Sequence, residues 1–178
     1  MKCRHCKNLL ENTFLDLGSA PPSNAYITED TLNRPEKYYP LKVDVCNKCW
    51  LVQTQDYAQV DELFSADYAY FSSTSKSWVA HAKNYTEAII NRLGLSKTSY
   101  VIEVASNDGY LLKNFLAAGI PCMGIEPTAS TATVAEQLKI PVLREFFGEE
   151  IGRKLAFKGK QADLIIGNNV YAHAPDIN

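Results

Sequence analysis

Two cysteine pairs constrain this chain more than any other sequence feature. Cys3 and Cys6 form the first pair and Cys46 and Cys49 the second, with two residues between the members of each pair. This spacing lets both sulfur atoms of a turn face one ion, and two such turns complete a tetrahedral site. The sequence therefore predicts a structural zinc ion held by four thiolates. The alternatives are four reduced thiols without a metal, or a redox-active pair.

The span between the pairs indicates what the metal would do. Residues 7–45 separate the two pairs, so the site would join distant parts of a small, loop-rich module of about residues 1–60, which is too small to fold well on apolar burial alone. A closed four-thiolate site has no open position for catalysis, so the zinc would stabilise the fold. We expect His5 to be exposed rather than a ligand, and Cys122 to be an inert core residue.

Composition and charge exclude several classes of protein. Of the 178 residues, 46% are hydrophobic, which is too many for a disordered chain, and 18 Lys and Arg face 20 Asp and Glu. Residues 1–60 contain seven basic and seven acidic side chains, whereas a nucleic-acid binder usually has a basic excess. No apolar run approaches the ~20 residues that span a bilayer. We expect a soluble, cytoplasmic protein without nucleic-acid or membrane partners.

The remainder of the chain has the pattern of an α/β fold. Residues 61–98 read as a linker and helical connector, with a helix over 76–93 whose apolar residues recur every three or four positions and which Gly94 ends. From residue 99 strands and helices alternate. The expected strands are 100–105, 122–126, 141–143 and 162–168, and the expected helices are 109–118, 129–138 and 149–157. Such alternation is typical of a parallel, doubly wound sheet.

A polar turn after the first of these strands is a candidate cofactor site. The turn Ser106-Asn107-Asp108-Gly109 follows a strand that contains Glu103, and we expect a helix to begin near Gly109. Backbone N–H groups at that point would favour a carboxylate or phosphate group. Glu126, at the end of the next strand, is placed to bind both hydroxyl groups of a ribose. The sequence thus favours a nucleoside-bearing cofactor, although it lacks the G-x-G-x-x-G pattern of nicotinamide enzymes.

Two further motifs remain ambiguous from spacing alone. Asn168 and Asn169 follow the last strand and could bind a ligand, and His173 could act as a general acid or base. Alternatively, the asparagines form a turn and His173 caps a helix. Tyr68 and Tyr70 lie in an aromatic, hydroxyl-rich segment that could contact a polar substrate or could be a hinge packed against the sheet.

Taken together, these motifs resemble the S-adenosylmethionine-dependent sugar C-methyltransferases, which methylate a deoxysugar carbon. The matching segments are Cys3–Cys6, Phe14–Asn24, Tyr39–Gln53, Leu63–Phe64, Asp67–Ser73, Ile102–Gly109, Gly124–Pro127, Phe146–Gly148 and Asn168–Asp176. Their order along nearly the whole chain makes the resemblance specific. It implies a zinc-binding N-terminal module followed by a Rossmann-like methyltransferase domain, here residues 99–178.

The resemblance also implies a reaction and a set of site residues. The substrate would be a nucleotide-linked 4-keto-6-deoxysugar, carried on dTDP, whose C3 proton is removed by a base so that the enolate carbon attacks the methyl group of S-adenosylmethionine. His173 and either Tyr68 or Tyr70 would lie close to the sugar. The ribose of the cofactor would bind Glu126 and its methionine portion the Ser106–Gly109 turn, with Glu103, Asn168 and Asn169 as further cofactor-binding candidates.

The chain departs from the family pattern in two respects. A methyltransferase sheet normally has seven strands, whereas this sequence ends just after the fourth and has no Tyr-x-Glu-His cluster, so we expect a truncated enzyme without useful turnover by itself. Ala105 stands where the family often has glycine. Two other functions stay open, a zinc-stabilised interaction module and an RNA methyltransferase, and the oligomeric state is not predicted.

Overall fold

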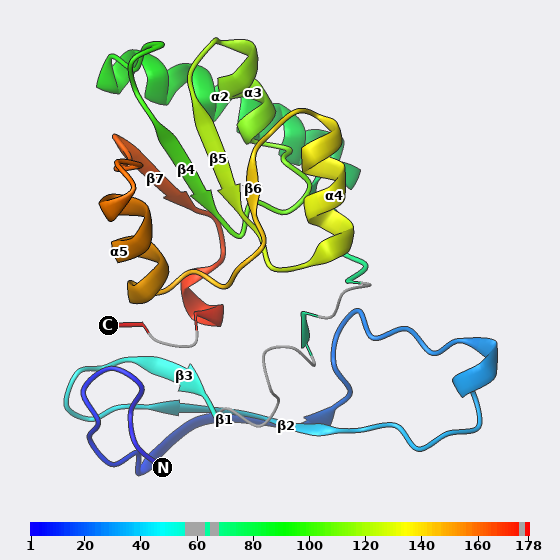
Figure 1. Ribbon diagram of the computed structural model, residues 1–178. Coiled ribbons are helices and arrows are strands. Elements are labelled where there is room, and N and C mark those ends of the chain that lie inside the picture. Colours follow the sequence, from blue (N-terminus) through cyan, green and yellow to red (C-terminus); the bar gives the residue numbers. More distant parts are fainter. Residues whose placement is uncertain (56–62, 65–67, 175–176) are drawn as a thin grey trace. The chain divides into compact units, whose positions relative to one another are not determined.

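The computed structural model describes residues 1–55, 63–64, 68–174 and 177–178, which divide into two compact units (Figure 1). The first unit comprises the described residues within Met1–Ser65 and Pro175–Asn178, and the second those within Ala66–Ala174. Asp67, Pro175 and Asp176, which belong to two of the matching motifs, lie outside the described residues. Each unit has its own sheet.

The first unit is built on a three-stranded antiparallel sheet in the order β1-β2-β3. Its strands are β1 (Asn12–Ala20), β2 (Tyr39–Val45) and β3 (Val52–Thr54), and a single 3₁₀ turn, η1 (Glu29–Thr31), lies between β1 and β2. Residues 41–45, in which apolar and polar side chains alternate as is typical of a strand, lie within β2. Two irregularities interrupt the pairing of β1 with β2, between Thr13 and Leu15 and between Asp16 and Ser19.

The first unit has almost no apolar core. Among its described residues, the buried side chains are those of Cys3, Asp44, Cys46 and Gln53. Large apolar side chains of β1 are exposed instead, as in Phe14. Because none of the four buried residues is a large hydrophobic one, hydrophobic burial contributes little to the stability of this unit.

The second unit alternates helices with parallel strands, as expected. Its elements are η2 (Ser72–Thr74), α2 (Lys76–Leu93), β4 (Val101–Val104), α3 (Leu112–Ala117), β5 (Cys122–Ile125), α4 (Ala129–Gln137), β6 (Val142–Leu143), α5 (Glu149–Phe157), β7 (Leu164–Gly167) and η3 (Tyr171–His173). The strands form one sheet in the order β6-β5-β4-β7, and all neighbours run parallel. The predicted α/β fold class, a zinc-binding module followed by part of a Rossmann-like domain, is confirmed.

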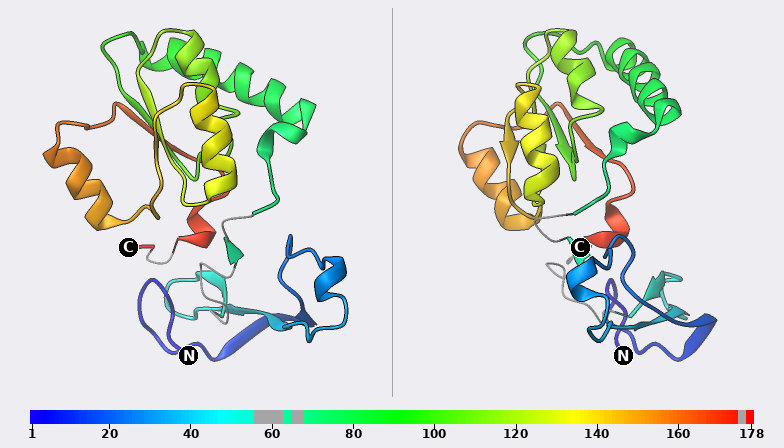
Figure 2. Two further views of the ribbon diagram at one scale, coloured as in Figure 1. Left: turned by 45° about the vertical axis from the view of Figure 1, so that its right-hand side comes forward. Right: turned by 90° about the vertical axis from the view of Figure 1, so that its right-hand side faces the viewer.

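Helices cover both faces of this sheet (Figure 2). On one face, Phe115 of α3 and Ala82 of α2 pack with Val101 of β4, and α4 contributes Ala135. On the other face Leu155 of α5 packs with strand residues in a smaller cluster. The strand order reverses at β4, since β5 and β6 lie on one side of it and β7 on the other, and ligands of open α/β sheets bind at such a point beyond the carboxyl ends of the strands.

Helix α3 differs from the expectation at its start. The sequence predicted a helix from Gly109, but α3 begins at Leu112 because residues 106–109 form a turn, in which the Gly109 N–H donates to the Ser106 carbonyl at 3.1 Å. The cofactor candidates therefore belong to a turn and not to a helix N-terminus. In the part of the chain that the structure describes, every helix is too short or too polar to span a bilayer.

Candidate metal centre and cofactor site

The two cysteine pairs form turns of the same geometry. In the first, the Lys7 N–H donates to the Cys3 carbonyl at 3.0 Å, and in the second the Trp50 N–H donates to the Cys46 carbonyl at 2.9 Å. Lys7 and Trp50 each follow the second cysteine of a pair, and they have positive φ angles of 60° and 64°. Glycine usually takes positions with positive φ, but lysine and tryptophan stand here. The sequence therefore gives no indication of the left-handed conformation at these turns.

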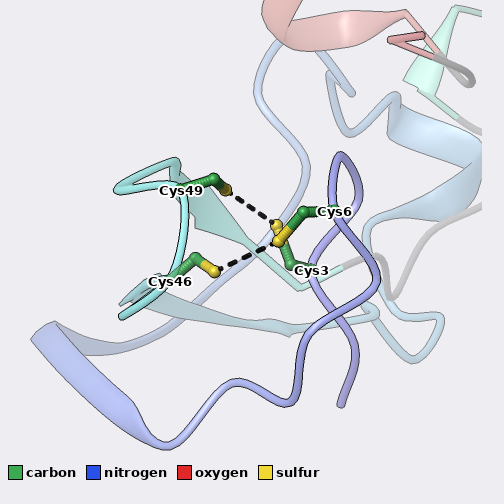
Figure 3. Close-up of side chains that lie close together, drawn as sticks. All are labelled: Cys3, Cys6, Cys46 and Cys49. Carbon is green, nitrogen blue, oxygen red and sulfur yellow. Dashed lines mark hydrogen bonds between the residues drawn. The ribbon is translucent and has the colours of Figure 1, made fainter.

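The four sulfur atoms converge on one point (Figure 3). All lie within 4.8 Å of one another, and the Sγ atoms of Cys3 and Cys49 and those of Cys6 and Cys46 are 3.6 Å apart. Sulfur atoms 2.3 Å from a tetrahedral zinc ion are about 3.8 Å apart. The four-thiolate arrangement thus fits a structural zinc ion and leaves it no open coordination position.

Gln53 supports this centre from β3, and spacing alone did not single it out. Its side-chain Oε1 accepts from the Arg4 N–H at 2.9 Å, and its Nε2 donates to the Cys3 Sγ at 3.3 Å. Burial raises the pKa of the Cys3 thiol, but the Gln53 hydrogen bond and backbone N–H groups outweigh it and lower the pKa to about 6. Gln53 therefore favours the thiolate form of Cys3, which is the form that binds a metal.

In the second unit, a buried carboxylate organises the turn after β4. Glu126, 4% exposed, accepts the Asn107 N–H at Oε2 and the Thr128 N–H at Oε1, both at 2.9 Å, and the Thr128 hydroxyl also bonds to Oε1. Strand β5 ends one residue before Glu126 and β4 two residues before Ser106, so both groups lie at the carboxyl ends of adjacent parallel strands. The structure thus brings Glu126 and the predicted turn together.

Two buried polar groups beside this turn lack hydrogen-bond partners among the described residues. One is the carboxylate of the fully buried Glu103, with both of its oxygens unpartnered. The other is the hydroxyl of Ser106. Burial raises the pKa of Glu103 well above 4.5, and the charges of Asp108 and Glu126 raise it further. The nearby polar side chains of Asn168 and Tyr110 lower the pKa of Glu103 in part, although neither forms a hydrogen bond with the carboxylate.

Glycine and positive φ angles in this region have structural reasons. Gly109 has a φ of 76°, which favours glycine, and a Cβ there would lie 2.5 Å from Ile140 Cδ1, so the end of that side chain would have to shift. Ala105 has a φ of 53°, which explains why glycine suits that position in the family pattern.

The residues after β7 contribute one observed contact to this region. Asn168 Nδ2 donates to the Tyr110 hydroxyl at 3.1 Å, and burial raises the pKa of Tyr110 to about 12. Asn169 has a φ of 54° and lies in a bend, and His173 is exposed at the end of η3. The catalytic role of His173 stays a prediction.

The tyrosine segment, residues 68–73, reaches the candidate cofactor turn, Ser106–Gly109, which is called the cofactor turn below. Its main chain bonds to Asn107, Asp108 and Ser130, and the Tyr68 and Tyr70 rings lie 6.5 Å apart at their centroids. Tyr70 is 51% exposed and Tyr68 is half-buried.

Comparison with known proteins adds two findings. A family model described as "Putative zinc binding domain" (Methyltransf_13) matches residues 3–64. The C-methyltransferase NovU of Streptomyces niveus is 29% identical over 177 residues, which cover 99% of this chain and 42% of that protein. The chain therefore spans less than half the length of this relative. With the four-cysteine cluster, the family match supports the predicted zinc ion.

Proposed function

We propose that this chain is related to the sugar C-methyltransferases and that its second unit binds S-adenosylmethionine for methyl transfer to a nucleotide-linked sugar. The first unit would hold a structural zinc ion and take no part in the chemistry, since its four-thiolate centre is closed.

The observation that carries the proposal is the charge of the candidate cofactor site. Two buried carboxylates, those of Asp108 and Glu126, lie just beyond the carboxyl ends of β4 and β5, and no described arginine or lysine pairs with them. Such a site would repel the pyrophosphate of a dinucleotide. It suits a cofactor that carries cationic groups, as S-adenosylmethionine does with its sulfonium and amino groups, and this argues against nicotinamide chemistry.

The chain's own residues suggest how the cofactor would be held. The Glu126 carboxylate would accept the ribose hydroxyls, and the Ser106–Gly109 turn with the unpartnered Glu103 oxygens would face the methionine portion. Asn168 and Asn169 would complete the site from the end of β7. When bound, S-adenosylmethionine supplies an electrophilic methyl group.

The sugar substrate and its chemistry are the finer part of the proposal. In a dTDP-linked 4-keto-6-deoxysugar, the ketone acidifies the C3 proton, so a base generates an enolate whose C3 attacks the methyl group. His173, Tyr68 and Tyr70 are the candidates to take that proton or to orient the sugar. Support comes from the resemblance and from the attachment of the tyrosine segment to the cofactor turn.

Exchange of the C3 proton tests these roles apart from methyl transfer. The chain is incubated with a dTDP-4-keto-6-deoxysugar in D₂O, and deuterium at C3 is followed by NMR. If one of the three residues is the base, His173→Asn, Tyr68→Phe or Tyr70→Phe should slow exchange by roughly 100-fold or more. Exchange that no substitution changes would contradict the assignment.

Binding tests the cofactor site itself. Native mass spectrometry of the chain with S-adenosylhomocysteine should show one zinc ion and one bound nucleoside per chain. Glu126→Gln should remove the nucleoside and keep the zinc, while Glu145→Gln, an exposed carboxylate beyond β6, should keep both. Zinc without the nucleoside in the unsubstituted chain would favour an interaction module, and preferential binding of RNA would favour the RNA methyltransferase alternative.

A further inference from the structure

The main chain of the tyrosine segment, Tyr68–Ser73, is hydrogen-bonded to the cofactor turn. The Ser72 N–H donates to Asn107 Oδ1 at 2.8 Å, and Asn107 Nδ2 donates to the Tyr70 carbonyl at 3.0 Å. The Ser73 N–H donates to Asp108 Oδ2 at 3.0 Å. A fourth bond joins the hydroxyl of Ser130, in the first turn of α4, to the Tyr68 carbonyl at 3.0 Å.

Asn107 has the central place in this arrangement. Its side-chain amide both accepts from and donates to the main chain of the segment. Its own main-chain N–H donates to Glu126 Oε2. Its φ of 51° is left-handed, a conformation that asparagine tolerates better than most residues. Both partners are buried, since Asn107 is 8% exposed and Ser72 7%. One residue thus connects the candidate ribose carboxylate with the tyrosine segment.

The side chains of Asn107 and Asp108 are therefore occupied by protein partners. Asp108 accepts from Ser73 at one oxygen and from the Tyr110 N–H at the other, at 3.3 Å. The bonds to the segment use its main-chain atoms, so the phenol rings of Tyr68 and Tyr70 take no part in them. The turn can fix where the segment runs without engaging the hydroxyl groups that a sugar substrate would meet.

We propose that Asn107 is a positioning residue that fixes the tyrosine segment against the cofactor turn, so that cofactor binding at Glu126 also orders the substrate side of the site. The second part rests on the proposed function, and the first does not. Loss of the Asn107 amide should free the segment locally, because the amide satisfies the buried N–H of Ser72 and the partly buried carbonyl of Tyr70.

Hydrogen exchange of the whole chain tests the first part without any ligand. Asn107→Gly removes the amide and keeps a residue that accepts positive φ, so it separates the side-chain effect from backbone strain. Exchange of the amides of residues 70–74 should become about tenfold faster or more, which corresponds to the loss of one to two hydrogen bonds. The amides of β4 and β5 should keep their protection. Unchanged exchange in residues 70–74 would overturn the proposal.

Two further variants sharpen this test. Asn107→Asp keeps an acceptor for Ser72 but loses the donor to Tyr70, so it should free the segment less than Asn107→Gly. Asn114→Ala removes another asparagine amide that bonds to main-chain carbonyls, at Tyr110 and Leu111 in the same unit, and should leave residues 70–74 unchanged. An equal effect of Asn114→Ala would show a general loss of stability and contradict a specific role of Asn107.

The second part is measured by repeating the exchange with S-adenosylhomocysteine. In the unsubstituted chain, binding should slow exchange of residues 70–74 in addition to that of the turn, and in Asn107→Gly it should protect the turn alone. Protection of the turn without the segment in the unsubstituted chain would refute the coupling. Absence of any binding would instead refute the proposed cofactor site, and the ligand-free comparison would still decide the role of Asn107.

Discussion

Gln53 shows how much one side chain can contribute to a metal centre beyond its ligands. Its amide bonds to the Cys3 sulfur and to the Arg4 N–H, so it holds the first cysteine turn against β3. Gln53→Leu should weaken zinc binding about 10- to 100-fold, because the thiolate loses a donor and the turn loses a contact. Competition with a chromogenic chelator measures this affinity.

Gln55 provides the matched control. It lies one residue after β3, and its amide bonds to Asp44 Oδ2 at 2.9 Å and to no cysteine that the structure describes. Gln55→Leu should therefore leave the zinc affinity within about twofold, even where it lowers stability. Equal losses in the two variants would mean that Gln53 acts through the fold and not through the thiolate.

Glu103 should give the second unit a distinctive pH dependence. Its pKa is raised in the folded chain, chiefly by burial, so the folded state holds the proton more tightly than the unfolded state. Its contribution to stability is full below pH 4.5 and is lost as the pH rises through the folded pKa. Glu103→Gln removes this loss, so the free energy of unfolding of the variant should exceed that of the unsubstituted chain increasingly above pH 4.5.

Denaturant titration between about pH 4 and pH 8 measures that difference. Comparison of the two proteins at each pH cancels the titration of the other carboxylates, and Glu145→Gln serves as an exposed control. A difference that stays constant with pH would show that Glu103 is ionised in the folded chain at a normal pKa.

At the scale of elements, two glycines have opposite effects on helix stability, because one ends a helix and the other lies inside one. Gly94 ends α2 with a φ of 61°, and a Cβ at this position would meet only open space, so Gly94→Ala should cost about 1 kcal/mol through backbone strain alone. Gly152 lies inside α5, where a Cβ would make ordinary contacts with the Phe147 ring at 3.8 Å. Gly152→Ala should therefore stabilise the chain by about 1 kcal/mol.

The two substitutions have opposite expected signs although they make the same chemical change. Thermal unfolding followed by circular dichroism measures both. A loss of stability in Gly152→Ala would contradict the helical geometry of α5, and a gain in Gly94→Ala would contradict the left-handed end of α2.

The same local signals explain which elements the sequence could predict. Helix α2 was predicted with its observed bounds, because Ser75 accepts the Trp78 N–H at its start and Gly94 ends it. Strand β1 was not predicted. Its apolar residues Phe14, Leu15 and Leu17 do not alternate regularly with polar ones, so the pattern by which strands are recognised is weak, and nearly all its side chains are exposed.

The candidate site was predictable to a similar extent. Cysteine spacing predicted the four sulfur atoms that the structure brings together, and strand ends predicted that the turn and Glu126 lie side by side. The partners that hold them could not be predicted. Gln53 and the Asn107 contact with Ser72 depend on pairs 50 and 35 residues apart in the chain, and a single sequence carries no signal for such contacts.

At the scale of the whole molecule, the two units should depend on the metal to different degrees. The described part of the first unit buries two cysteines and two polar residues and no large apolar side chain, whereas the second has apolar clusters on both faces of its sheet. Metal binding must therefore supply most of the folding free energy of the first unit. Chelation of zinc should unfold the first unit and leave the second folded.

The two tryptophans of the chain can report on this separately, because Trp50 belongs to the second cysteine turn and Trp78 to α2. With Trp78→Phe, the fluorescence of Trp50 should change on addition of a strong chelator and recover with zinc. With Trp50→Phe, the fluorescence of Trp78, which stacks on Tyr110 at 6.0 Å, should stay constant. Simultaneous changes of both reporters would mean that the metal stabilises the second unit as well, and no change in either would contradict a metal-dependent fold.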